Sequence, residues 1–200
     1  MKTSRTSLMS ILAVLVVLAL AIGSRMAVWN SGDHASGTSQ AIGGAFTLIN
    51  GDGQTVSDQD FRSKWMLIYF GYTFCPDVCP TSLSLMSEAL DKLPADRQKM
   101  ITPVFITVDP ARDTAAVVKD YVAAFRPDMI GLTGSQDQVA AMMRNYKVYA
   151  ARAKGDDPAH YTVDHSSILY LVGPDGRFVA HFAHGTNSSD IAAALGKYLK

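Results

Sequence analysis

The sequence has little cysteine and no excess of either charge. Its two cysteines are too few for a disulfide scaffold, and a body of about 160 residues can bury a core without one. Its 18 basic and 18 acidic residues balance, and no basic cluster occurs, which argues against nucleic acid as a partner. Apolar residues make up 48% of the chain and charged residues 18%, which excludes a disordered, collagen-like or coiled-coil protein.

The charges are distributed unevenly along the chain. Beyond residue 25, the chain carries 15 basic and 18 acidic residues, so its body is mildly acidic. Residues 1–25 contain no acidic residue and three basic ones, namely Lys2, Arg5 and Arg25. By the positive-inside rule, Lys2 and Arg5 place the N-terminus in the cytoplasm, so we expect the body to be exported.

An uncharged apolar run covers residues 8–22. Its length of about 22 Å falls short of the hydrocarbon core of a bilayer, but extension to Trp29 makes it sufficient. We therefore predict that residues 1–29 anchor the chain in the cytoplasmic membrane. The alternative is a cleaved signal peptide with an A-x-A site at residues 19–21, which would release a soluble body. Both interpretations place the body in the periplasm or an equivalent space.

The segment that follows, residues 30–44, is rich in glycine and serine and is predicted to be a flexible tether. Residues 45–200 then form a single domain in which strands alternate with helices. Buried strands and hairpins are predicted at residues 45–50, 55–56, 65–72, 101–108, 129–132, 167–172 and 177–182. Helices are predicted at residues 81–93, 115–125, 136–148 and 190–199.

This order predicts an α/β fold with a mixed sheet: parallel central strands, an antiparallel hairpin at one edge, and helices on both faces. With a cysteine pair at a strand-to-helix junction, it is a thioredoxin-like arrangement. Ser135 and Ser189 are expected to cap the last two helices. Asp113 or Thr114 is expected to cap the helix before them. Asp109 and Arg112 are expected, together with Asp113, to fix the loop that precedes it rather than to bind a metal.

Cys75 and Cys79 stand at the junction between a buried strand and a helix. On a helical turn, this spacing directs both sulfurs to the same side, close enough for a disulfide. The helix N-terminus is expected to lower the thiol pKa values. Two such thiolates could reduce another disulfide or bind a soft metal ion, and the three intervening residues leave room for a third ligand. Structural cysteines are the remaining alternative.

Among the five histidines, His165 directly precedes an apolar strand, on a loop that this fold brings beside the cysteine turn. Taken alone, a loop histidine is more often exposed or structural. His181 and His184 lie on or after the last strand, and we do not expect them to form a second metal site.

Four segments, in order, resemble the Sco/SenC family. They are FGYTFCPDVCPT at residues 70–81, VDPARDT at 108–114, GLTGS at 131–135 and YTVDHSS at 161–167. The resemblance covers roughly residues 41–200, and the apolar N-terminal segment also suits the family. It implies a thioredoxin-like domain outside the cytoplasmic membrane that serves as a copper chaperone. The implied client is the binuclear copper centre of cytochrome c oxidase.

The resemblance also implies the copper ligands, which fall on Cys75, Cys79 and His165. Two thiolates and an imidazole suit Cu(I) and neutralise Cu(II), whereas Zn(II) with a water is the competing occupant. Asp77 and Asp164, which are close to these ligands in the sequence, are expected to orient them by hydrogen bonding. Alternatively, both carboxylates satisfy N–H groups of the loops or the helix end.

Together these features predict a metallochaperone rather than an enzyme. The protein would bind one copper ion, dock on the copper-centre subunit of the oxidase and pass the ion on by ligand exchange. One alternative is a thiol–disulfide oxidoreductase that keeps the copper-ligand cysteines of the oxidase reduced. Another is a redox or copper sensor. His165 discriminates between chaperone and reductase, because a dithiol reductase needs no third ligand.

Overall fold

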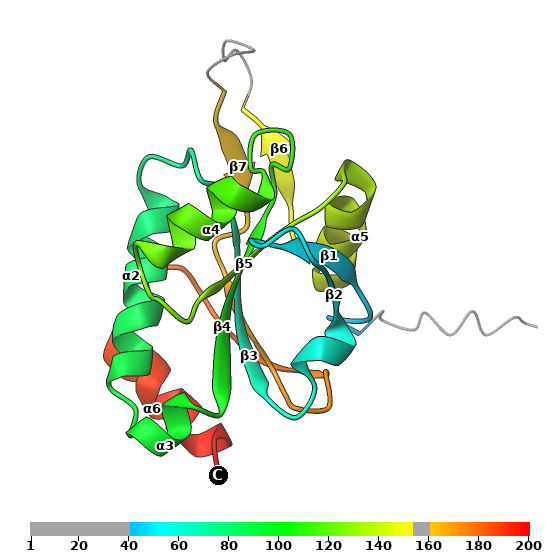
Figure 1. Cartoon of the computed structure of the whole chain (residues 1–200). Coiled ribbons are helices and arrows are strands. Elements are labelled where there is room, and N and C mark those ends of the chain that lie inside the picture. The colour runs from blue at the N-terminus through cyan, green and yellow to red at the C-terminus, as the bar shows by residue number, and fades with distance from the viewer. Residues whose placement is uncertain (1–40, 154–160) are drawn as a thin grey trace, which may run out of the picture. The chain divides into compact units, whose positions relative to one another are not determined.

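The computed structural model describes residues 41–153 and 161–200 (Figure 1). The predicted anchor at residues 1–29 and most of the predicted tether lie outside these residues. Residues Ala41–Lys200 form one compact unit. Within the part that the structure describes, no helix is long and apolar enough to cross a membrane.

The core of the domain is a seven-stranded mixed sheet with the order β2-β1-β5-β4-β3-β8-β9. Its strands are β1 (Thr47–Asn50), β2 (Thr55–Ser57), β3 (Trp65–Gly71), β4 (Ile101–Thr107), β5 (Ile130–Thr133), β8 (Leu169–Val172) and β9 (Phe178–Phe182). β4 pairs in parallel with β3 and β5, whereas β8 and β9 continue the sheet in antiparallel fashion. This confirms the predicted mixed sheet and its edge hairpin.

The central strands are buried along almost their whole length, because helices cover both faces of the sheet. Six of the seven residues of β3 and six of the seven of β4 are buried. A parallel strand covered on both faces needs such a continuous apolar run. The two strands pair in register from Trp65 with Ile101 to Gly71 with Thr107, so both end at the same edge of the sheet.

Among the described residues, five α-helices and one 3-10 helix accompany the sheet. They are η1 (Asp58–Phe61), α2 (Val78–Asp91), α3 (Ala95–Gln98), α4 (Ala115–Ala123), α5 (Gln136–Tyr146) and α6 (Ser188–Tyr198). Figure 1 shows α2 and α6 on one side of the central strands and α5 on the other. α2 starts three residues earlier than predicted, and Pro80 is its third residue, where an N–H would have no partner within the helix.

The helix caps were predicted with mixed success. Thr114 accepts a hydrogen bond from the backbone of Val117, and Ser135 forms a capping box at the start of α5, as expected. The prediction for Ser189 was wrong. Asn187 caps α6 instead, because its side chain accepts from the N–H of Asp190 and so starts the helix two residues earlier.

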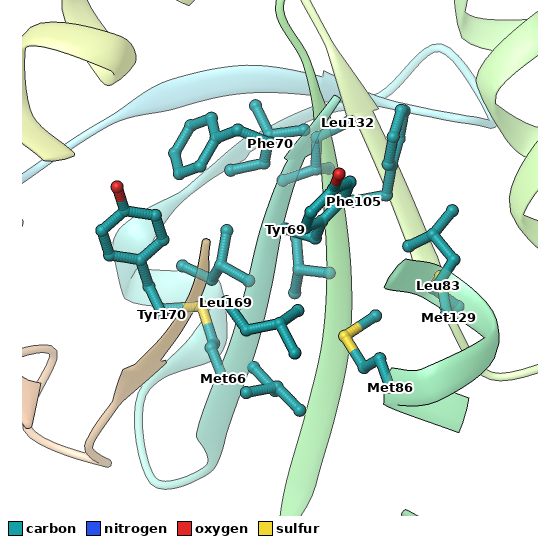
Figure 2. Packing of buried hydrophobic residues seen from close by; sticks show 14 of the residues in the cluster. Met66, Tyr69, Phe70, Leu83, Met86, Phe105, Met129, Leu132, Leu169 and Tyr170 are labelled. Atoms are coloured by element: carbon teal, nitrogen blue, oxygen red, sulfur yellow. The ribbon is translucent and has the colours of Figure 1, made fainter. Parts of the chain in front are cut away.

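Apolar side chains from the sheet and from α2 form the core. Figure 2 shows Leu83 and Met86 of α2 beside residues of the sheet, among them Tyr69 and Phe105. All four side chains are completely buried. This packing fixes α2 on the sheet and so places its N-terminus at the edge where β3 and β4 end.

The structure also contains a hairpin that the sequence did not predict. β6 (Ala150–Arg152) and β7 (Val163–His165) pair only with each other, in a separate two-stranded sheet. Strands of three residues show too little alternation to be detected in a sequence. This hairpin matters because His165 is its last strand residue.

Candidate metal centre

The cysteine arm of the site is the connection between β3 and α2. Cys75 lies in this loop, and Cys79 lies in the first turn of α2, after the N-cap residue Asp77. The expectation of one helical turn carrying both cysteines was therefore only partly right. The backbone N–H of Cys79 nevertheless donates to the Cys75 sulfur over 3.3 Å. Cys79 is fully buried, Cys75 is half-buried, and neither is in a disulfide.

The histidine arm is the β6–β7 hairpin. His165 pairs with Ala150 across the hairpin, and its Nε2 atom lies 3.3 Å from the sulfur of Cys79. The rings of Tyr69 and Tyr72 approach the imidazole at 6.1 and 5.8 Å between centroids, both nearly perpendicular to it. Tyr69 of β3 and Tyr72, the residue after β3, therefore restrict how this ring can turn.

The imidazole of His165 is in the form that binds a metal. Its Nδ1 atom lies 3.2 Å from the backbone carbonyl of Ser166. Because a carbonyl oxygen only accepts, Nδ1 carries the proton and the lone pair of Nε2 faces Cys79. Burial lowers the pKa of His165, and this effect exceeds the opposing effects of Ser166 and Asp164. The ring is therefore neutral near pH 7.

Ligand atoms of Cys75, Cys79 and His165 all lie within 4.8 Å of one another. Three ligands bonded to one ion at about 2.0–2.3 Å, the lengths found for zinc, stand about 4 Å apart. The three groups thus fit one ion after small shifts. They are the only cluster of three or more histidine, cysteine or acidic residues with this geometry in the described residues, and it includes neither His181 nor His184.

Burial has a stronger effect on the pKa of the Cys79 thiol than the helix N-terminus has. It raises the pKa of the Cys79 thiol well above its usual value, and a backbone hydrogen bond from Tyr72 only partly opposes this. The predicted lowering of the pKa is wrong for this residue, because desolvation of the thiolate dominates. A bound cation would supply the countercharge that a buried thiolate lacks.

Gly71, the last residue of β3, leaves space for the Cys79 sulfur. A Cβ atom at this position would lie 2.9 Å from that sulfur, 2.9 Å from the ring of Tyr69 and 3.0 Å from the ring of Phe105. Such distances are too short for any side chain. No pattern in the sequence indicated that this glycine borders the site.

Comparisons with known proteins agree with this geometry. Residues 34–200 match the SCO1/SenC family. The chain belongs to this family. It is 42% identical to protein sco1 of Schizosaccharomyces pombe over 159 residues, which are 78% of this chain and 60% of that protein. It is 39% identical to the human mitochondrial SCO1 homolog over 160 residues, 80% of this chain and 53% of that protein. The chain thus covers only 53–60% of the length of these two relatives.

Solved structures of SCO1/SenC proteins have the same thioredoxin-like fold. Copper-bound ScoI of Bradyrhizobium japonicum aligns with a TM-score of 0.72 and 42% identity, over 80% of this chain and all of that one. Copper-bound ScoI of Arabidopsis thaliana aligns with a TM-score of 0.72 and 38% identity, over 78% of this chain and 97% of that one. BsSco, for which a disulfide switch is described, belongs to the Sco family of cytochrome c oxidase assembly proteins. It aligns with a TM-score of 0.63 and 27% identity, over 78% of this chain and 92% of that one.

Two acidic residues of this SCO1/SenC protein were expected to orient its ligands. Asp77 is exposed at the start of α2, and its carboxylate accepts from the hydroxyl of Thr81 over 3.5 Å, which is a helix-end role. Asp164 is also exposed, and its charge raises the pKa of His165. Asp164 therefore acts on the imidazole through its charge, and hydrogen bonding to a ligand stays a prediction for both residues.

A buried carboxylate supports the cysteine arm. Asp113 is fully buried and accepts from the backbone N–H of Thr73 over 3.0 Å and from the hydroxyls of Thr73 and Thr107, each over 2.6 Å. Thr73 lies two residues before Cys75, so Asp113 fixes the start of the cysteine loop. The sequence predicted that Asp113 fixes its own loop, but not that it holds a loop 40 residues away.

Proposed function

We propose that this protein is a copper chaperone that delivers copper to cytochrome c oxidase during assembly of the enzyme. The observation that carries the proposal is the convergence of two thiols and a neutral imidazole within 4.8 Å. Two sulfurs and one nitrogen suit the soft, low-coordinate Cu(I) ion, and two thiolates also balance the charge of Cu(II). The copper-bound ScoI relatives support copper over zinc as the occupant.

The burial of the three ligands favours transfer of the ion over permanent storage. Cys79 is completely buried, whereas Cys75 is only half-buried and is followed by two exposed residues, Pro76 and Asp77. An incoming ligand from a partner can therefore reach the ion on the side of Cys75 and displace this sulfur first. Cys79 and His165 would hold the ion until the partner supplies further ligands.

The proposed partner is the copper-centre subunit of cytochrome c oxidase, by analogy with the assembly role stated for the Sco family. Thiol–disulfide exchange is the second candidate, since the two sulfurs are close and reduced and BsSco has a disulfide switch. A dithiol reductase needs no third ligand, whereas Nε2 of His165 lies 3.3 Å from the Cys79 sulfur. Copper transfer is therefore the better supported activity.

The proposed location is the periplasmic face of the cytoplasmic membrane, with residues 1–29 as the anchor. The basic residues before the apolar run at residues 8–22 support this orientation. Alkaline phosphatase fused to the C-terminus should be active, because that reporter folds only outside the cytoplasm. A well-expressed but inactive fusion would overturn the orientation, whereas a soluble product starting near Ile22 would favour a cleaved signal.

The test of the function is a transfer experiment. The copper-loaded full chain is mixed with the copper-free, reduced copper-centre domain of the oxidase subunit, and the two are separated and assayed for copper. We expect copper to move to the oxidase domain. The same domain is then offered in its disulfide form to the copper-free chain. Reduction of that disulfide without copper transfer in the first experiment would overturn the chaperone proposal in favour of the reductase.

A further inference from the structure

One loop contacts both arms of the metal site. It connects β4 to α4 and comprises residues 108–114, which include Asp113, the carboxylate that holds the cysteine arm through Thr73. The histidine arm is the hairpin β6–β7, which pairs with no strand of the main sheet. With three residues in each strand, this hairpin cannot fix its own position. Contacts with the rest of the domain therefore help to place His165 beside Cys79.

Arg112 makes such contacts from the 108–114 loop. Its Nη1 donates to the backbone carbonyl of Tyr161 over 2.9 Å, and its Nε donates to the carboxylate of Asp109. The guanidinium carbon lies 3.6 Å from the ring centroid of Tyr161 and 4.7 Å from that of Phe74, the residue before Cys75. Arg112 thus touches both arms.

Tyr161, at the start of the segment that leads into β7, is fixed by hydrogen bonds and by contacts of its ring. Its hydroxyl donates to Asp109 over 2.8 Å, and its carbonyl accepts from Arg112. Its ring lies between the guanidinium groups of Arg112 and Arg152, which are 3.6 and 3.7 Å from the ring centroid. Only three residues separate Tyr161 from His165, so the position of Tyr161 bears on that of the imidazole.

The ion pair of Arg112 with Asp109 is buried, and the contacts of Arg112 depend on the shape of its guanidinium group. Only 17% of the Arg112 side chain and 7% of that of Asp109 are exposed. The planar guanidinium can donate to Asp109 and Tyr161 while it stacks on the Tyr161 ring, and a lysine ammonium cannot do all three. Charge at this position is therefore insufficient, and the shape of the arginine is required.

We propose that Arg112 is a positioning residue that acts through Tyr161 to hold His165 at metal-binding distance from Cys79. The inference rests on the proposed copper site and assigns Arg112 no contact with the ion. Its loss should weaken the contribution of the imidazole and leave that of the two sulfurs intact.

The test compares the full-length wild type with Arg112→Lys and Tyr161→Phe. The first variant keeps a cation beside Asp109, and the second keeps the stacked ring, so both should fold. Arg177→Ala is the control, because the Arg177 side chain is 87% exposed. Cu(I) affinity is measured by competition with a chelator, and imidazole coordination by the nitrogen couplings in the electron paramagnetic resonance spectrum of the Cu(II) form.

We expect Arg112→Lys to bind copper about 10–100-fold more weakly, the range for residues that orient a metal ligand. The copper affinity of Tyr161→Phe should also fall. The nitrogen couplings should weaken in both variants and stay unchanged in Arg177→Ala. In a His165→Ala background, Arg112→Lys should cost no further affinity, because the residue it positions is gone.

Two results would overturn the inference while the wild type still binds copper. One is wild-type affinity and unchanged nitrogen couplings in both Arg112→Lys and Tyr161→Phe. The other is an undiminished loss from Arg112→Lys in the His165→Ala background, which would reveal a general structural role. Failure of the wild type to bind copper would instead refute the proposed function, and the positioning role with it.

Discussion

Replacing Cys79 by serine is expected to abolish tight copper binding while the domain stays folded. The variant removes the fully buried sulfur ligand, and the serine hydroxyl that replaces it is a hard, protonated donor. If three ligands share a binding free energy of about 10 kcal/mol, each carries about 3 kcal/mol, so affinity should fall at least about a hundredfold. Competition with a Cu(I) chelator measures this loss.

Cys75→Ser should have an effect of the same order, because both sulfurs belong to the cluster. The matched control is Ser82→Ala, which changes a buried polar side chain one turn further along α2 and removes no ligand. Thermal unfolding of the copper-free proteins checks that all three variants are folded. Wild-type affinity in either cysteine variant would refute the assignment of the site.

Replacing His165 by alanine should separate copper transfer from thiol chemistry. The variant loses the imidazole that lies 3.3 Å from Cys79 but keeps both sulfurs and the loop that carries them. Copper binding should weaken about as much as in the cysteine variants, and more for Cu(II), whose ligand set becomes incomplete. Thiol–disulfide exchange should largely persist, because it depends on the thiols and on access to them.

In cells, His165→Ala should therefore block cytochrome oxidase assembly when copper is scarce, and added copper should partly restore it by mass action. Oxidase activity at low and high copper measures both effects. His184→Ala is the control, because this exposed histidine lies outside the metal cluster. Normal assembly with His165→Ala under copper limitation would favour the reductase.

The sequence was sufficient to predict the main sheet and the positions of most helices. β3 and β4 are continuous apolar runs that end in turns, and such runs are detectable because strands covered on both faces tolerate few polar residues. The three-residue strands β6 and β7 were missed because they carry no comparable pattern. For the same reason, His165 was expected in a loop and is instead the end of a strand.

The site was only partly predictable. The spacing of Cys75 and Cys79 indicated a metal or redox site, but the resemblance to the Sco/SenC family was needed to join His165 to them. The raised pKa of Cys79 results from burial under residues distant in the sequence, which no local pattern reveals. The contacts of Arg112 with Tyr161 span 49 residues, so they too depend on the complete fold.

X-ray absorption at the copper K edge of the Cu(I)-loaded full chain tests the central claim most directly, because it identifies the atoms bound to the ion. We expect one copper per chain with two sulfur neighbours and one imidazole nitrogen. The nitrogen signal should disappear in His165→Ala, and one sulfur should disappear in any copper retained by Cys79→Ser. A wild-type spectrum with sulfur neighbours alone, or a spectrum that His165→Ala leaves unchanged, would contradict the three-ligand site.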